Sequence, residues 1–286
     1  MNLLGIDFED WYHPELIKKH QKQKSPEPMI INGIDKILDW LRVNDTYATF
    51  FVVGELLEFK PELLDKITES GHEIAFHTMH HTRLDEANYK ENFLSDLERF
   101  SQLTNKKSKG FRAPSFSLSK YTSWAIDALL SHGYVYDSSV VPVKTKLYGI
   151  NGAQTTPYMI SNFSLEKHDP SGKLIEFPLL TINILTKKFP AGGGFYLRLL
   201  PTKIINSAIK SMNQTNNPAT FYIHSWELTP ELMPKISLPF IDNFITYFNI
   251  KNAPKKMTDI IREFEFTSFE RYISKHKINS NKFNNS

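Results

Sequence analysis

Two histidines in segment 71–81 (GHEIAFHTMHH) have a spacing compatible with metal binding. His77 and His81 are four positions apart, so both imidazoles can bind one metal ion if the backbone turns at the end of a strand. A carboxylate from another strand end would complete a set of two histidines and one carboxylate, which is common at catalytic zinc sites. Because the better-known HExxH spacing belongs to helices, a polar loop that happens to contain histidines is an equal alternative.

Segment 7–11 (DFEDW) supplies candidate carboxylates for such a site. Asp7, Glu9 and Asp10 lie within four positions at the end of an apolar run, and their mutual repulsion requires a cation or a positive partner nearby. The alternative is a helix start, where acidic residues cap the first turn. Considered together with the histidine pair, the metal interpretation is favoured.

Three further polar residues follow short apolar runs. Arg112 lies in the sequence FRAP, Asp137 lies in YDSS, and His224 ends the run FYIH. Each has a purely structural alternative: a surface arginine in a turn, a capped turn, and a core histidine bonded to backbone. Their shared position after an apolar run favours one common site.

Short apolar runs alternate with amphipathic segments along most of the chain. The runs expected to form strands are residues 3–7, 48–53, 73–77, 110–112, 134–137, 174–177 and 220–224. Apolar residues at helical spacing predict helices within 33–43, 61–70, 86–103, 119–131 and 201–212. This alternation predicts an α/β protein with parallel strands. Polar groups capable of chemistry follow five of the strands, and a barrel gathers such strand ends at one mouth, so we expect a barrel.

The composition excludes several kinds of site and partner. The 286 residues contain no cysteine, which excludes disulfides, thiolate metal sites and a cysteine nucleophile. A net charge of +3 makes nucleic acid a poor candidate partner. No apolar run of membrane-spanning length occurs, and the N-terminus has no basic leader, so we expect a cytoplasmic protein without a membrane span. We expect one domain over residues 1–270, with an irregular insertion near 144–172 and a polar tail over 271–286.

Taken together, the motifs resemble those of the polysaccharide deacetylase family, also known as the NodB-homology domain or carbohydrate esterase family four. The family's TFDDG-like, H-[ST]-x-x-H, R-x-P and final L-x-H-like motifs are matched here by FEDW (8–11), HTMHH (77–81), RAP (112–114) and YIH (222–224). The phrases GHEIAFH, GFRAPSFS, YDSSVVP and FPAGGGFYLRLLP resemble a bacterial branch associated with exopolysaccharide and surface-glycan gene clusters. This sequence departs from the family in three places: Glu9 stands where the family has an aspartate base, Trp11 replaces a small residue, and only Asp137-Ser138 matches the fourth motif.

The resemblance implies a distorted (β/α)7-type barrel that binds a divalent metal ion, expected to be Zn²⁺. Motif matching makes Asp10, His77 and His81 the metal ligands. The same matching makes Glu9 the general base, with Asp7 as its competitor.

The remaining matched residues complete the implied catalytic set. Arg112 would hold the base as a carboxylate, and His224 would be the general acid, oriented by Asp137. The implied reaction removes acetyl from an N-acetylated sugar or glycan, and the sequence leaves open whether that sugar is free, nucleotide-linked, lipid-linked or polymeric. Two alternatives stay open: a hydrolase of small cyclic amides or imides on the same barrel, and a catalytically silent glycan-binding module.

Overall fold

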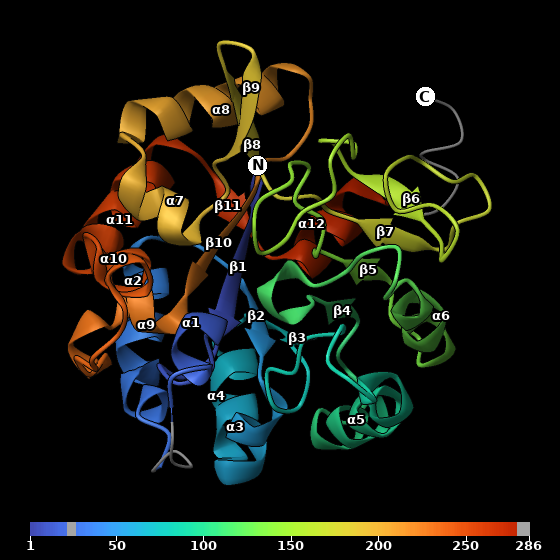
Figure 1. The fold of residues 1–286 in the computed structure, drawn as a ribbon, viewed down its shortest axis with the longest axis horizontal. Coiled ribbons are helices and arrows are strands. Elements are labelled where there is room, and N and C mark those ends of the chain that lie inside the picture. The colour runs from blue at the N-terminus through green and yellow to red at the C-terminus, as the bar shows by residue number, and fades with distance from the viewer. Residues whose placement is uncertain (22–26, 279–286) are drawn as a thin grey trace.

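The computed structural model describes residues 1–21 and 27–278. Its main sheet has the strand order β10-β1-β2-β3-β4-β5-β7-β6, with β11 pairing on β1 (Figure 1). The strands are β1 Asn2–Phe8, β2 Thr49–Val52, β3 Glu73–Phe76, β4 Gly110–Phe111, β5 Tyr136–Asp137, β6 Tyr158–Ile160, β7 Leu174–Glu176, β10 Thr220–His224 and β11 Phe266–Thr267. All neighbouring strands from β10 to β7 pair in parallel, whereas β6 is antiparallel to β7.

The curled sheet nearly closes on itself. The segment that follows β7 approaches β10 through a parallel bridge between Leu179 and Thr220, and the Leu180 N–H donates to the Thr220 carbonyl at 3.0 Å. β10 therefore pairs with β1 along one edge. Along its other edge, β10 is bridged to the segment that follows β7. This arrangement confirms the predicted distorted (β/α) barrel.

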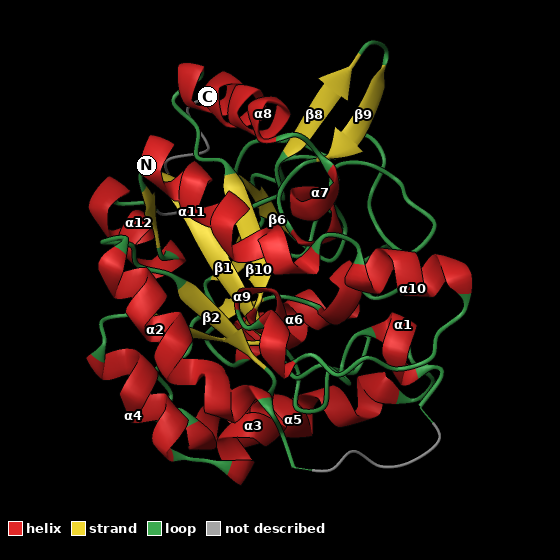
Figure 2. Ribbon diagram, turned by 90° about the vertical axis from the view of Figure 1, so that its left-hand side faces the viewer, coloured by secondary structure: helices red, strands yellow, loops and turns green. Residues whose placement is uncertain are grey.

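Helices surround the sheet on its outer face (Figures 1 and 2). The longer ones are α2 Ile34–Val43, α4 Glu62–Glu69, α5 Tyr89–Leu103, α6 Trp124–Ser131, α8 Thr202–Gln214, α10 Phe240–Tyr247, α11 Ala253–Glu263 and α12 Phe269–His276. The short ones are α1 Glu15–Lys18, α3 Gly54–Phe59, α7 Gly194–Leu199 and α9 Ser225–Leu228. In α2, the predicted apolar stripe of Ile34, Ile37, Leu38 and Leu41 is buried. The core between sheet and helices is aromatic where Phe76 of β3 packs on Phe100 of α5, with ring centroids 4.6 Å apart.

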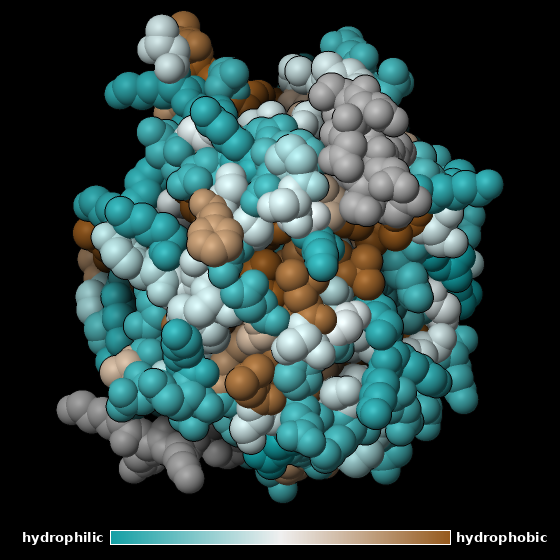
Figure 3. All heavy atoms as spheres, turned by 90° about the vertical axis from the view of Figure 1, so that its right-hand side faces the viewer, coloured by the Kyte–Doolittle hydropathy of each residue, from teal (hydrophilic) through white to brown (hydrophobic). Residues whose placement is uncertain are grey.

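Two regions differ from a simple repeat of strand and helix. The segment 144–172 contains one regular element, the edge strand β6, and is otherwise irregular. A hairpin of β8 Thr181–Ile184 and β9 Lys187–Pro190 projects from the barrel (Figure 2). The face that carries α6 and β6 is mostly hydrophilic, with apolar side chains gathered near its centre (Figure 3).

The C-terminal end is more ordered than the sequence composition suggests. Residues 269–276 form α12, so the expected polar tail begins inside a helix; residues 279–286 lie outside the described part. Phe269 and Tyr272 are buried, and Phe269 stacks on Tyr136 with 5.1 Å between ring centroids. This apolar spacing of three residues anchors the helix across the amino ends of the strands. None of the described helices has the length and apolarity needed to cross a membrane.

Candidate active site

The predicted site residues on β1, β3, β4 and β10 meet at the carboxyl ends of these strands. A cavity of about 350 Å³ is lined there by Asp7, Glu9, His77, His81 and His224, among others. Asp7 and His224 are direct partners in the register between β1 and β10. Polar groups that follow different strands therefore gather at one mouth of the barrel, as the sequence analysis expects.

Strand alternation determines which acids of segment 7–11 enter the cavity. Successive residues of a strand point to opposite faces. Leu4, Ile6 and Phe8 pack into the core beneath the helices. Asp7 and Glu9, two positions apart, accordingly share the inner face.

Glu9, His77 and His81 form a buried cluster whose candidate ligand atoms all lie within 4.8 Å of one another. His81 Nε2 is 2.7 Å from Glu9 Oε2. His77 Nδ1 bonds the Arg112 carbonyl at 2.7 Å, and because a carbonyl only accepts, Nδ1 carries the proton and Nε2 keeps its lone pair. The turn expected after β3 is present, since Thr78 and His81 have positive φ values of 59° and 51°.

The donor set fits a divalent cation. Within the described residues, Glu9 Oε2 and His81 Nδ1 are buried without a hydrogen bond of good geometry. Burial opposes ionisation of Glu9, but the neighbouring His81, His224 and His77 outweigh it and hold the Glu9 pKa well below its usual range. Burial lowers the pKa of His77 to about 4, so this imidazole is neutral at pH 7, as a metal ligand must be.

Asp10 is not brought to this cluster. Its carboxylate accepts the backbone N–H groups of Trp11 at 2.7 Å and Ile30 at 2.8 Å. Its own N–H donates to His13 Nδ1 at 2.8 Å. The side chain thus stabilises the turn after β1 and ties it to Ile30, the first residue of the 3-10 helix Ile30–Gly33. The structure places Glu9 where the sequence analysis expected Asp10.

A second group of residues supports the cluster from outside. The His13 ring stacks on His81, with centroids 5.8 Å apart. Glu55 bonds His13 Nε2 at 2.8 Å and His80 Nδ1 at 2.7 Å through its two oxygens. Glu55 therefore restrains the His13 ring, which packs on His81, and also His80, which precedes His81 in the chain.

Arg112 contacts Asp7 rather than Glu9. Its fully buried guanidinium donates from Nη1 to Asp7 Oδ1 at 2.5 Å and from Nε to the Ser138 carbonyl at 3.0 Å. It also lies over the Phe51 ring, 3.9 Å from the centroid. Gly5 leaves room for it, because a Cβ there would be 2.6 Å from Nη1. Asp7 is thus held in place by a fixed positive partner.

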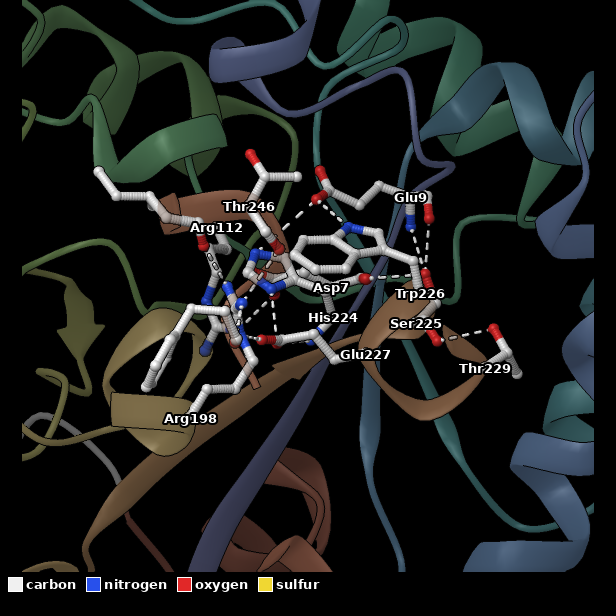
Figure 4. A network of polar contacts seen from close by, with 12 residues as sticks. Asp7, Glu9, Arg112, Arg198, His224, Ser225, Trp226, Glu227, Thr229 and Thr246 are labelled. Carbon is white, nitrogen blue, oxygen red and sulfur yellow. Dashed lines mark hydrogen bonds and ion pairs between the residues drawn. The ribbon is translucent and has the colours of Figure 1, made fainter. Parts of the chain in front are cut away.

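His224 has a buried carboxylate partner that the sequence analysis missed (Figure 4). Glu227 Oε2 bonds His224 Nδ1 at 2.8 Å, and Arg198 Nε donates to Glu227 Oε1 at 2.6 Å. Burial disfavours the imidazolium, but the negative charges of Glu227 and Glu9 outweigh it and raise the pKa of His224. His224 also stacks on Trp226, with 4.5 Å between ring centroids.

Asp137 lies away from His224, on the outer side of the sheet. It is the register partner of Glu176, and Ser139 Oγ donates to its Oδ1 at 2.6 Å. Burial raises the pKa of both Asp137 and Glu176, and the neighbouring Asp137 carboxyl group raises that of Glu176 further. In the described structure, the role expected of Asp137 beside His224 is filled by Glu227.

A sequence pattern could have revealed Glu227 but not Arg198. Glu227 is three residues after His224 and accepts the His224 N–H at 3.1 Å, which completes a capping box at the start of α9. Arg198 comes from α7, and its remaining donors bind the carbonyls of Ile245, Thr246 and Phe248. No local pattern predicts this contact, because the two residues are brought together only by the closed barrel.

Comparison with known proteins agrees with this architecture. Residues 30–136 match the family model described as Polysaccharide deacetylase, and residues 138–274 match one described as Domain of unknown function (DUF3473). The two matches meet inside the sheet, since β5 before the boundary pairs with β7 after it. Residues 30–136 therefore match the polysaccharide deacetylase family, and they lie in a barrel whose motifs match those of that family.

Individual relatives match only parts of the chain or only its fold. A peptidoglycan deacetylase of Helicobacter pylori is 30% identical over 112 residues, which are 38% of this chain and 37% of that protein. The first curated relatives are matched over 37%, 30% and 37% of their own lengths. A putative polysaccharide deacetylase structure from Mycobacterium smegmatis superposes with a TM-score of 0.57 at 16% identity, covering 96% of this chain and 90% of that one. A probable polysaccharide deacetylase from Pseudomonas aeruginosa PAO1 gives 0.54 at 12% identity, with the same two coverages, 96% and 90%.

Proposed function

We propose that this protein is a metal-dependent N-deacetylase that acts on an N-acetylated sugar or glycan. One observation carries the proposal: a buried cluster of a carboxylate and two histidines lies between Asp7, fixed by Arg112, and His224, fixed by Glu227. Amide hydrolysis needs this combination, because a base must accept a proton from water and an acid must protonate the departing amine.

Glu9, His77 and His81 would hold the metal ion, in place of the set Asp10, His77 and His81. Two imidazole nitrogens and one carboxylate suit Zn²⁺, which commonly takes three protein ligands at catalytic sites. When bound, such an ion polarises a carbonyl and lowers the pKa of water. The partners of the ligands fix their directions, since the Arg112 carbonyl orients His77 and the Trp226 indole donates to Glu9 Oε1 at 3.0 Å.

Asp7 would be the general base, rather than Glu9. In the described structure Arg112 bonds only its Oδ1, which leaves Oδ2 to accept the proton of the attacking water. Glu9 is unsuited to this role because its two oxygens face Trp226 and His81. The buried guanidinium of Arg112 keeps Asp7 oriented toward the cavity.

His224 would be the general acid. Glu227 holds Nδ1, so Nε2 is directed to the cavity, where it lies 3.7 Å from Glu9 Oε1. The water oxygen forms a bond to the acetyl carbon while its proton passes to Asp7. The carbon–nitrogen bond then breaks as nitrogen takes the Nε2 proton, which gives acetate and a free amine. The raised pKa of His224 keeps that proton available near neutral pH.

Aromatic residues of the cavity support a sugar as the substrate. Phe116, Tyr148, Tyr222 and Trp226 line it, and such rings pack on the apolar faces of sugars while their polar edges remain free to bond. Curated relatives carry the names peptidoglycan deacetylase and chitooligosaccharide deacetylase. With the sequence resemblance to a branch linked to surface glycans, this favours an N-acetylated glycan of the cell surface as the substrate.

Acetate release from a panel of N-acetylated monosaccharides, oligosaccharides and sugar nucleotides, with and without a chelator, tests the proposal. We expect chelator-sensitive release by the wild-type protein. Asp7→Asn should retain the metal but lose activity by about a hundredfold or more, as for removal of a general base. Release only from small cyclic amides would instead identify an imide hydrolase. Glycan and metal binding without any release would identify a silent binding module.

A further inference from the structure

A second cavity adjoins the catalytic one. It has a volume of about 370 Å³, close to the 350 Å³ of the catalytic cavity. Phe116, Leu147 and Tyr148 line both cavities, so these residues form a shared wall between them. A ligand that crosses this wall from the catalytic cavity enters the second one directly.

The loop that carries half of this wall has a defined conformation. Thr145 N–H donates to the Tyr148 carbonyl at 2.8 Å, and Thr145 Oγ1 accepts the Tyr148 N–H at 3.0 Å. The Tyr148 ring packs edge-on against Phe116, with centroids 5.3 Å apart. Leu147 is nevertheless 49% exposed at the top of the wall. The loop thus presents an apolar crest at a fixed place between the cavities.

The lining of the second cavity combines an exposed aromatic ring with uncompensated positive charge. Tyr121 is 78% exposed, and Lys120 Nζ lies 4.9 Å from its ring centroid. Lys120 and Lys144 have no carboxylate partner within the described part of the chain. Arg83 is neutralised by Asp85 through two contacts of 2.8 Å.

Only one acidic residue opposes these lysines in the second cavity. Glu166 is the remaining carboxylate of the lining, so two free ammonium groups face one free acid. An exposed ring beside cationic groups suits a sugar that carries an anionic substituent, because the ring takes the apolar face and the ammonium groups take the charge.

We propose that the substrate is a glycan of at least two residues that occupies both cavities. The acetamido sugar lies in the catalytic cavity, and the neighbouring residue crosses the Leu147–Tyr148 crest. Its anionic substituent, a carboxylate or a phosphate, meets Lys120 and Lys144. The identity of the acetamido sugar in the catalytic cavity rests on the proposed deacetylase function. The second cavity and its positive charge do not depend on that function.

Kinetics with the metal-loaded protein test the assignment. The substrates are an N-acetylated disaccharide with a neutral partner residue, one with a uronic acid, one with a phosphorylated residue, and a nucleotide-linked monosaccharide. We expect the lowest KM for an acidic disaccharide, and the double variant Lys120→Ala/Lys144→Ala should raise that KM about tenfold, as two exposed ion pairs suggest. Lys173→Ala removes an exposed lysine that lines neither cavity and serves as the matched control.

A binding measurement separates this assignment from the catalytic proposal. The disaccharides are titrated by calorimetry into Asp7→Asn protein, with and without the two lysine substitutions. Charge-dependent binding that the lysine substitutions weaken supports the second cavity even if no acetate is released from any substrate. Equal affinity for neutral and acidic disaccharides, unchanged by the substitutions, overturns it even if deacetylation is observed. A preference for the uronic acid, the phosphorylated disaccharide or the nucleotide-linked sugar identifies the source of the anionic group.

Discussion

Replacing Glu227 with glutamine should shift the pH range in which the protein is active. Glu227 is fully buried and bonds His224 Nδ1 at 2.8 Å, so its charge favours the imidazolium directly. A metal ion bound by Glu9 would offset the negative charge of Glu9 itself. Glu227 would then be the main anionic partner of His224. Loss of an opposite charge at this distance lowers a pKa by about 1–3 units.

The sign follows from the role of His224 as the proton donor. Activity requires the protonated imidazole, so the alkaline limb of the rate profile reports its pKa. In Glu227→Gln this limb should move to lower pH by about 1–2 units, because the amide keeps the hydrogen bond but not the charge. Arg198 keeps three backbone carbonyl partners, so the cost in the free energy of unfolding should be about 1–3 kcal/mol.

The assay is kcat/KM for acetate release between pH 5 and 10, with thermal unfolding measured in parallel. Glu227→Asp retains the charge and should leave the limb closer to that of the wild type. Asp137→Asn is the matched control, since that residue is buried beside Glu176 on the neighbouring strand, whereas His224 Nδ1 bonds Glu227. An alkaline limb that stays in place in Glu227→Gln but moves in Asp137→Asn would refute the assignment.

Further substitutions test the remaining parts of the site. Glu9→Gln should abolish metal binding. Asp10→Asn should retain the metal but lower the free energy of unfolding by about 1–2 kcal/mol, because its contacts with backbone N–H groups are weakened. Elemental analysis and thermal unfolding distinguish these outcomes. Arg112→Ala should lower turnover far more than metal content and destabilise the fold by about 3–5 kcal/mol, because it leaves Asp7 buried without its partner; equal loss of metal and turnover would contradict this. Burial raises the pKa of Glu73 to about 7, so its proton stabilises the fold below about pH 4.5 and this stabilisation is lost as the pH rises to about 7. Glu73→Gln should remove that dependence, and unfolding measurements across this range would show an unchanged slope if Glu73 is not the group responsible.

Much of the architecture could be predicted from the sequence because it depends on local patterns. The apolar runs mark the parallel strands, and the polar residues after them mark the mouth of the barrel. The structure places the histidine pair and Arg112 after strand ends, as the sequence predicts, because each directly follows an apolar run. α12 was missed because its five charged or polar residues resemble a tail, although Phe269 and Tyr272 give it one buried face.

The contacts between distant segments could not be predicted in the same way. Glu227 and Arg198 are 29 residues apart, and their ion pair depends on how α7 packs beside β10. Asp137 was predicted to orient His224 because of its place in the order of the family motifs. The pleat of β5 instead directs its side chain outward, beside Glu176. Motif order records sequence position, whereas the direction of a side chain depends on the geometry of its strand.

The acids of segment 7–11 show what strand geometry decides. Two carboxylates can face the same cavity from one strand only if they are an even number of positions apart, unless the backbone turns between them. Asp7 and Glu9 meet this condition, so one can accept the guanidinium of Arg112 while the other reaches the two histidines. Asp10 is the next residue, and each of its two carboxylate oxygens accepts a backbone N–H group. This geometry is the reason why we propose Glu9, which departs from the family motif, as the metal ligand and Asp7, two residues earlier, as the base.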